Sequence, residues 1–208
     1  MSKPTILLIG AGGHALSCID VLEQQGTYQI AGLIGMPNEM NDQHLGYSVI
    51  GTDSYLSQLA NIHKYALITI GQIKTPTHRL RLYQLALNLG FLFPVIVSSG
   101  AYVSPHAFIG AGTIVMHGAI VNARARIGKN CIINSRALVE HDTTVEDNCH
   151  ISTGTILNGN VHIGAGSFIG SGCVIKEGVR VGKICTIGMG LSVRHSLTDG
   201  ALHLGQIV

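Results

Sequence analysis

The sequence of 208 residues contains no tryptophan, and aromatic residues make up only 5% of it. Charged residues are also scarce, at 12%, and 13 Lys and Arg nearly balance 11 Asp and Glu. Nucleic acids and anionic membrane surfaces are bound by clustered basic charge, so we expect neither as a partner. The chain also lacks an apolar run of about 18 residues, which a membrane-spanning helix needs.

The five cysteines do not predict a disulfide framework. No Cys-x-x-Cys pair occurs, and the number is odd. The apolar stretch near the N-terminus, Ile6–Ile9, is too short for a signal peptide. We therefore expect a cytoplasmic protein with free thiols.

Segments typical of strands and of helices alternate in the first part of the chain. Short apolar runs typical of buried strands lie at residues 5–9, 28–34, 49–51 and 65–70. Helical segments are predicted up to Gln25, after a start at Thr52–Ser54, and over residues 77–89. This alternation predicts a small Rossmann-like parallel sheet with right-handed crossovers. We place this α/β domain at residues 1–94, with its boundary at Phe93-Pro94.

A six-residue period governs the remaining residues, 95–208. Every sixth residue from Val97 is aliphatic: Val97, Val103, Ile109, Val115, Val121, Ile127, Ile133, Val139, Val145, Ile151, Leu157, Ile163, Ile169, Ile175, Val181, Ile187 and Val193. A fixed short period is the mark of a solenoid. The pattern resembles the hexapeptide-repeat left-handed parallel β-helix, an all-β fold in which three hexads make one triangular coil. About five such coils fit this region.

The 18-residue coil predicts which side chains stack. Cys131 and Cys149 are one coil apart, and the same column continues to Ser167 and Cys185. Because small side chains fit near an inner corner, we interpret these cysteines, and Cys173 in another column, as structural.

One stretch that departs from the simplest hexads carries candidate catalytic groups. His141 lies two residues after an inward-facing valine, so its side chain should point outward. Its neighbours Glu140 and Asp142 could keep one ring nitrogen protonated and leave the other free as a base. The alternative is an ordinary solvated histidine. Asn134 and His150, which should also face outward, favour a site.

Four stretches of the chain carry a resemblance to a known family: residues 9–15 (IGAGGHA), 134–150 (NSRALVEHDTTVEDNCH), 151–153 (IST) and 157–159 (LNG). In these stretches the chain resembles the bacterial sugar acetyltransferases of bacillosamine and sialic-acid-type (nonulosonate) biosynthesis. Members of that family join a small nucleotide-sugar-binding βαβ domain to a left-handed β-helix and form homotrimers. The resemblance implies transfer of an acetyl group from acetyl-CoA to a nucleotide-activated or sialic-acid-type sugar, at an amino group in preference to a hydroxyl. It implies no metal.

The resemblance also implies roles for individual residues. His141 matches the general base, and Asp142 matches the acidic residue that assists it. His150 matches a position that contacts the acetyl donor or the substrate. We assign substrate contacts to five residues of two stretches, Gly10, Gly12, Gly13, His14 and Asn134.

Two further contacts with acetyl-CoA are expected from the order of the coils. Gly159 follows His141 by one coil, and its N–H could stabilise the oxyanion of the reaction. Basic residues of the later coils are candidates for the coenzyme phosphates or are solvated charges: Lys176, Arg180, Lys183 and Arg194. Of these we assign Lys176. Because one face of a β-helix is too flat to enclose two substrates, we expect the site to form between subunits.

A dinucleotide site is the alternative for the first glycines. Gly10-x-Gly12-x-x-Ala15 fits a relaxed fingerprint after a strand, but such a site needs an acidic residue at the end of the second strand. Residues 34–36 offer none, which argues against NAD. The family acidic pair expected after this strand is also missing. As a further alternative, the glycines serve only a tight turn.

Two other functions are open for the solenoid itself. A trimeric scaffold or ligand-sensing protein could use the same fold without catalysis. A zinc site like that of the γ-carbonic anhydrases could be built from His117, His141 and His150, but that family lacks the N-terminal βαβ domain.

Overall fold

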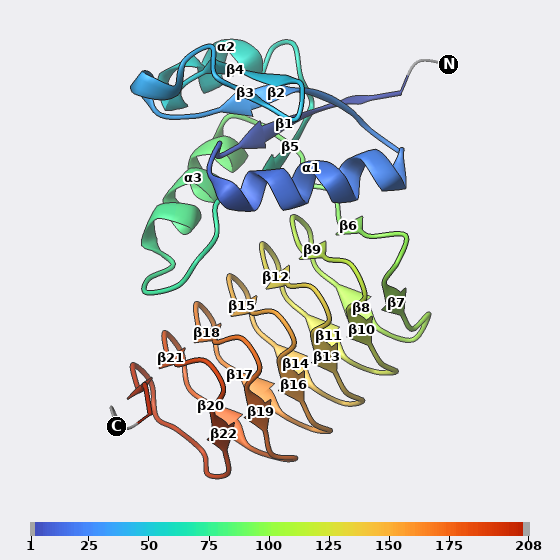
Figure 1. Ribbon diagram of the computed structural model, residues 1–208, viewed down its shortest axis with the longest axis vertical. Helices are drawn as coiled ribbons and strands as arrows, with labels where there is room; N and C mark the ends of the chain where they lie inside the picture. The colour runs from blue at the N-terminus through green and yellow to red at the C-terminus, as the bar shows by residue number, and fades with distance from the viewer. Residues whose placement is uncertain (1–2, 206–208) are drawn as a thin grey trace. The chain divides into compact units, whose positions relative to one another are not determined.

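The computed structural model describes residues 3–205, which fall into two compact units (Figure 1). Residues 3–71 and 77–99 form the first unit, and residues 72–76 and 100–205 form the second. The division after Ser99 lies a few residues beyond the boundary that we placed at Pro94. The segment Gln72–Pro76 belongs to the second unit, although it lies between two elements of the first.

The first unit is an α/β sheet with short helices. Its elements are β1 (Thr5–Ile9), α1 (Gly13–Gln25), β2 (Gln29–Ile34), η1 (Pro37–Glu39), β3 (Gln43–His44), β4 (Tyr47–Gly51), η2 (Asp53–Tyr55), α2 (Leu56–Leu59), β5 (Tyr65–Ile68), α3 (Thr77–Asn88) and β6 (Ile96–Val97). The sheet order is β3-β4-β2-β1-β5, parallel except for the β3–β4 pair. The predicted strands and helices are therefore present, with ends that move by one or two residues.

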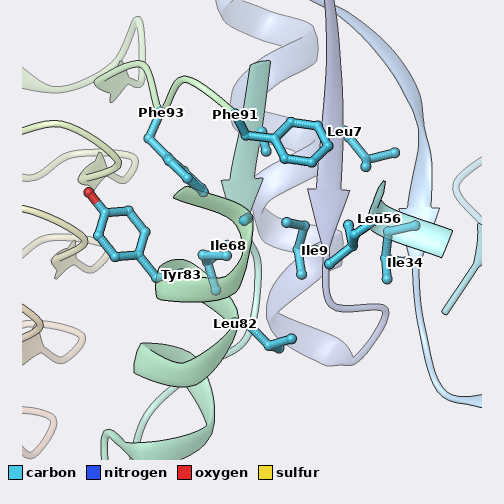
Figure 2. Packing of buried hydrophobic residues seen from close by; sticks show 11 residues of the cluster. Leu7, Ile9, Ile34, Leu56, Ile68, Leu82, Tyr83, Phe91 and Phe93 are labelled. Carbon is cyan, nitrogen blue, oxygen red and sulfur yellow. The ribbon is translucent and has the colours of Figure 1, made fainter. Parts of the chain in front are cut away.

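Aliphatic and aromatic side chains fill the core of this unit (Figure 2). Leu7 and Ile9 of β1 and Ile68 of β5 are fully buried, because parallel strands covered by helices have little solvent contact. Tyr83 of α3 packs against Phe93 with ring centroids 4.6 Å apart. The core therefore holds α3 and the chain after it against the sheet.

The second unit is a solenoid of two-residue strands in three parallel sheets (Figure 1). The β13 sheet contains β7 (Tyr102–Val103), β10 (Ile120–Val121), β13 (Leu138–Val139), β16 (Ile156–Leu157), β19 (Val174–Ile175) and β22 (Ser192–Val193). The β14 sheet contains β8 (Phe108–Ile109), β11 (Arg126–Ile127), β14 (Thr144–Val145), β17 (His162–Ile163) and β20 (Arg180–Val181). The β15 sheet contains β9 (Ile114–Val115), β12 (Ile132–Ile133), β15 (His150–Ile151), β18 (Phe168–Ile169), β21 (Thr186–Ile187) and β23 (Leu202–His203).

The register confirms the 18-residue coil. Ile133 pairs with Ile151, and Val139 pairs with Leu157, each one coil further along. The periodic aliphatic residues are buried from Val115 to Val193. The unit is the expected hexapeptide-repeat left-handed β-helix.

The corners of the solenoid need a left-handed backbone at every sixth residue. Fourteen consecutive such positions have φ between 51° and 73°: Gly112, Gly118, Arg124, Asn130, Arg136, Asp142, Asn148, Gly154, Asn160, Gly166, Gly172, Gly178, Ile184 and Gly190. Glycine and asparagine suit this region because it brings a side chain close to the backbone. We call these positions the corner column. Asp142, the predicted partner of His141, is one of its members.

The cysteines lie inside the solenoid, as predicted. Cys131, Cys149 and Cys185 are buried and form no disulfide, and the Cys149 N–H points at the Cys131 sulfur at 3.4 Å. Burial raises the pKa of the Cys149 thiol well above its ordinary value. A thiol in this state is a poor nucleophile, which agrees with a structural role.

Within residues 3–205, no helix is long and apolar enough to cross a membrane. No three His, Cys, Asp or Glu side chains come together there in a group that could hold a metal ion.

Candidate active site

His141 lies at the corner between β13 and β14, with 64% of its side chain exposed. Its Nδ1 is 2.9 Å from Asp142 Oδ2, and the other oxygen of that carboxylate is 2.8 Å from Arg124 Nε. An ionised carboxylate only accepts hydrogen bonds, so Nδ1 carries the proton. The neutral ring therefore has its lone pair on Nε2, which has no hydrogen-bond partner within residues 3–205. This is the arrangement of a general base.

The carboxylate of Asp142 is held in its charged form. The hydrogen bond from His141 lowers its pKa most, and the positive charge of Arg124 lowers it further. Arg124 precedes Asp142 by one coil in the corner column, so the two stack. The carboxylate is therefore oriented by His141 and Arg124 before any substrate binds.

Gly159 forms the floor beneath the imidazole. A Cβ at this position would lie 2.8 Å from both Cε1 and Nε2 of His141. The turn is fixed by its neighbour, since Asn158 Nδ2 donates to the Ile175 carbonyl at 2.8 Å and the Asn158 carbonyl accepts from Thr143 Oγ1. The Gly159 N–H has no acceptor among the described residues. The unpaired N–H of Gly159 and the unpaired Nε2 of His141 are therefore neighbours among the described residues.

A basic groove follows the same edge of the solenoid toward the C-terminal coils. Lys176 and Arg194 lie one and two coils beyond Asn158, and all three line a pocket of about 430 Å³ together with Ser192. The side chain of Lys176 is more than half exposed, and its nearest carboxylate, that of Glu177, is 4.0 Å away. The groove can accept an anionic group.

His150 lies on a different face, at the start of β15, and is only 6% exposed. Its Nε2 is 3.2 Å from Asn134 Nδ2, and its Nδ1 is 2.6 Å from the Gln72 carbonyl oxygen. The ring packs edge-on against Phe168, with centroids 5.2 Å apart. The side chain points away from the solenoid interior, as predicted, but the segment Gln72–Pro76 covers it.

An apolar pocket of about 670 Å³ adjoins His150. Its lining comes from the β15 sheet, the chain after it and the covering segment: Ile73, Lys74, His150, Ser152, Phe168, Gly170, Ser171, Thr186, Ile187, Gly188, Met189, Leu202 and Leu204. Lys74 is the one charged side chain in this lining. Gln72 and Lys74 were not predicted as site residues, because nothing local in that segment indicates contact with a coil far along the chain.

The glycine turn of the first unit lines a smaller pocket of about 160 Å³. Gly10 has φ 124°, its carbonyl accepts from Thr69 Oγ1 at 2.6 Å, and a Cβ there would meet Ile70 at 2.5 Å. Glycine is therefore required. Gly12 also lines the pocket and precedes α1, whereas Gly13 and His14 lie in the first turn of α1 outside the lining.

Carboxylates do reach this pocket, from positions that the sequence analysis did not consider. Glu39 of η1 accepts a hydrogen bond from the Met36 N–H at 2.6 Å, which folds its side chain back to the end of β2. Asp53 and His78 complete the polar lining. A carboxylate therefore lies at the end of β2, although residues 34–36 contain none.

Comparison with known proteins places both units in one family. The model of the PglD N-terminal domain matches residues 5–84, and the bacterial transferase hexapeptide model matches residues 124–159 and 142–177. A histidine-to-asparagine mutant of perosamine N-acetyltransferase from Caulobacter crescentus, solved with CoA and GDP-perosamine, is 30% identical with a TM-score of 0.92 over 98% of this chain and 95% of that chain. The chain is a bacillosamine-type sugar acetyltransferase.

Other solved structures of such acetyltransferases agree. The acetyltransferase domain of PglB from Neisseria gonorrhoeae, solved with acetyl coenzyme A, is 31% identical with a TM-score of 0.88, over 97% of this chain and 96% of that chain. WeeI from Acinetobacter baumannii is 25% identical with a TM-score of 0.86, over 98% and 97%. A search of curated protein sequences gives no significant match. The predicted family is confirmed. The alternative of a non-enzymatic scaffold is set aside because the similar solved structures are acetyltransferases, which are enzymes.

The acetyltransferase brings its predicted site residues together in three places. His141, Asp142 and Gly159 share one corner, with Lys176 further along the same edge. Asn134 contacts His150 instead, on the β15 side. Gly10 and Gly12 lie in the first unit. The Arg124–Asp142 pair was missed, although its 18-residue spacing is the one that stacks the cysteines.

Proposed function

We propose that this acetyltransferase transfers the acetyl group of acetyl-CoA to an amino group of a nucleotide-activated sugar, with His141 as the general base. The observation that carries the proposal is the exposed imidazole whose Nδ1 faces the Asp142 carboxylate while Nε2 has no partner among the described residues. Two relatives support the substrates, since one was solved with CoA and GDP-perosamine and another with acetyl coenzyme A.

The chemistry follows from this geometry. The sugar amine attacks the thioester carbonyl, and a C–N bond forms as His141 Nε2 takes the proton from the amine nitrogen. Asp142 stabilises the resulting imidazolium. The Gly159 N–H donates to the carbonyl oxygen as it becomes negative. Collapse of the tetrahedral intermediate breaks the C–S bond, and the CoA thiolate leaves and takes up the proton.

The glycine-turn pocket is the proposed place for the nucleotide. The N-terminus of α1, a helix of 13 residues, presents backbone N–H groups that suit a diphosphate. The carboxylates of Glu39 and Asp53 can accept from ribose hydroxyls or from N–H groups of a base. No NAD is needed to explain this pocket.

The coenzyme is proposed to lie between two copies of the chain. His141 and Lys176 lie on the edge that joins the β13 and β14 sheets, whereas His150 and its apolar pocket lie on the β15 face. One extended ligand can touch both only if the edge of one copy meets the face of another. A homotrimer with three such contacts satisfies this requirement by cyclic symmetry.

Replacement of His141 tests the chemistry. His141→Ala is expected to lower kcat by about 100-fold or more and to leave coenzyme binding unchanged. His195→Ala is the matched control, because this exposed histidine lies in the same column three coils further along. Mass spectrometry of products from acetyl-CoA and a panel of nucleotide 4-amino sugars identifies the substrate. Normal turnover by His141→Ala would remove His141 from the mechanism.

Mixed assemblies test the shared site. His141→Ala and His150→Ala variants, each impaired alone, are unfolded and refolded together at equal concentration. If the two histidines of one site come from different copies, about a quarter of the sites regain both. No recovery of activity, or an active monomer in sedimentation, would contradict the shared site.

A further inference from the structure

A chain of hydrogen bonds runs through His150 from one coil to the next, and its direction is fixed. Asn134 Oδ1 accepts from the Ser135 N–H at 2.8 Å, so its amide nitrogen is the atom that faces His150. An amide nitrogen can only donate, and His150 Nε2 must therefore accept. On the other side of the ring, a carbonyl oxygen can only accept, so Nδ1 must donate to Gln72. The ring is neutral, with its proton on Nδ1.

The carbonyl that selects this tautomer is itself anchored. Gln72 is 2% exposed, and its Nε2 donates to the Gly166 carbonyl at 3.0 Å. Pro76 closes the other end of the segment against Gly166, where a Cβ would lie 3.2 Å from Pro76 Cγ. Gly166 belongs to the corner column, which fixes where its carbonyl points. The segment therefore has one docked position on the coil.

The same segment forms part of the wall of the apolar pocket. Ile73 and Lys74, which follow Gln72 directly, line it together with His150. Release of the Gln72 side chain would free the carbonyl that holds His150 and would also loosen this wall. Both consequences concern the apolar pocket beside His150, and neither concerns His141, which lies on another edge of the solenoid.

We propose that Gln72 is a positioning residue for the acetyl donor, because its anchored backbone carbonyl holds His150 as the neutral Nδ1–H tautomer. The His150 ring is thereby fixed in the wall of the apolar pocket, because its Nδ1 donates to Gln72 and its Nε2 accepts from Asn134. The role in catalysis rests on the proposed function, in which His150 contacts acetyl-CoA. The tautomer itself does not depend on that function.

Gln72→Met tests the anchor, because methionine has a similar volume and no N–H donor. Gln84→Met is the matched control, since Gln84 is an exposed glutamine of α3. Loss of one such hydrogen bond is expected to raise the KM for acetyl-CoA by about 3- to 10-fold. The KM for the sugar and the pH profile of kcat should not change. Gln72→Ala is measured in parallel, with melting temperatures for all three variants.

Nitrogen NMR of ¹⁵N-histidine-labelled protein gives a second readout that needs no activity. The His150 signals, assigned by their loss in His150→Gln, should show a protonated Nδ1 and an unprotonated Nε2. In Gln72→Met they should move toward tautomer-averaged values, and in Gln84→Met they should not. A protonated Nε2 in the parent protein, or unchanged spectra in both Gln72 variants, would overturn the proposal. If the tautomer is confirmed but no sugar is acetylated, the proposed function has failed and the positioning of His150 stands.

Discussion

Two histidines half a coil apart have opposite surroundings in this acetyltransferase. His141 is exposed and uses one ring nitrogen, whereas His150 is buried and uses both. A general base needs a nitrogen that is free to take a proton, and a positioned binding group needs a ring that cannot turn. The comparison teaches that the partners of each nitrogen, more than the residue type, separate a chemical role from a positioning one.

Gly159→Ala should have the largest effect on this contrast, because it fills the space beneath the exposed ring. The new Cβ would lie 2.8 Å from Cε1 and Nε2, so the imidazole must swing away. A shift of about 1 Å in a reacting group can lower kcat by about 100-fold. The melting temperature should stay constant, because the displaced atoms belong to an exposed side chain. Steady-state kinetics and thermal melting check this together, and unchanged kcat would show that His141 does not act from its observed position.

Asp142→Asn should lower kcat by about tenfold, because the imidazolium loses its carboxylate. Asparagine occupies the same corner column at Asn130, Asn148 and Asn160, so the backbone is expected to stay intact. Asp142→Ala, which suits the column less well, should also lower the melting temperature. Equal kcat in Asp142→Asn and the parent would show that the carboxylate has no role in catalysis and that Asp142 serves only the corner.

The pH profile sharpens the same prediction. His141, and then Arg124, lower the pKa of Asp142. Any stability from this carboxylate is therefore present above the ordinary aspartate range and is lost as pH falls through the lowered value. The melting temperature of the parent should therefore fall at acid pH by an amount that Asp142→Asn does not show. The same pH dependence of melting in both proteins would contradict the stabilisation of this carboxylate by His141 and Arg124.

Cys149→Leu should act on the other histidine. Cys149 precedes His150 and is buried against Cys131, so a larger side chain overpacks the inner corner and costs about 1–3 kcal/mol of stability. The KM for acetyl-CoA should rise with it, while the pH profile that reports His141 keeps its shape. Cys149→Ala leaves only a small cavity and should keep normal kinetics. If the alanine variant melted normally but lost all activity, Cys149 would be a chemical group.

Ile184→Asn should have the smallest effect and should change neither kcat nor the KM for acetyl-CoA. Ile184 is a β-branched residue at φ 54°, where its backbone is strained. Since 60% of its surface is exposed, burial of its side chain offsets little of that strain. Asparagine tolerates this backbone, and we expect a gain of about 0.5–1 kcal/mol in the free energy of unfolding. Chemical denaturation measures it. A loss of stability would mean that the apolar surface of Ile184 matters more than its backbone.

The sequence predicted what depends on periodicity. The six-residue period places the inner cysteines, the outward side chain of His141 and the corner that carries it, because each coil repeats the one before. The same spacing predicts the Arg124–Asp142 stack, a signal that was present and went unused. The solenoid and the edge that carries His141 can therefore be predicted from the six-residue period alone.

What the sequence could not predict depends on contacts between distant segments. The cover over His150 comes from Gln72, 78 residues earlier, and no repeat relates the two. Glu39 reaches the glycine-turn pocket only because a short 3-10 turn folds it back onto the Met36 N–H. The first contact is non-local and the second depends on an irregular turn, so neither can be predicted from periodicity in the sequence.

The corner column also determines which changes of length the solenoid can accept. An insertion of 18 residues adds one coil and returns every later side chain to its former sheet, so the groove along the His141 edge would simply become longer. An insertion of six would instead turn every later residue by one face, and Lys176 would leave the edge that carries His141. Changes in the length of the solenoid in such an enzyme are therefore expected to occur in whole coils of 18 residues.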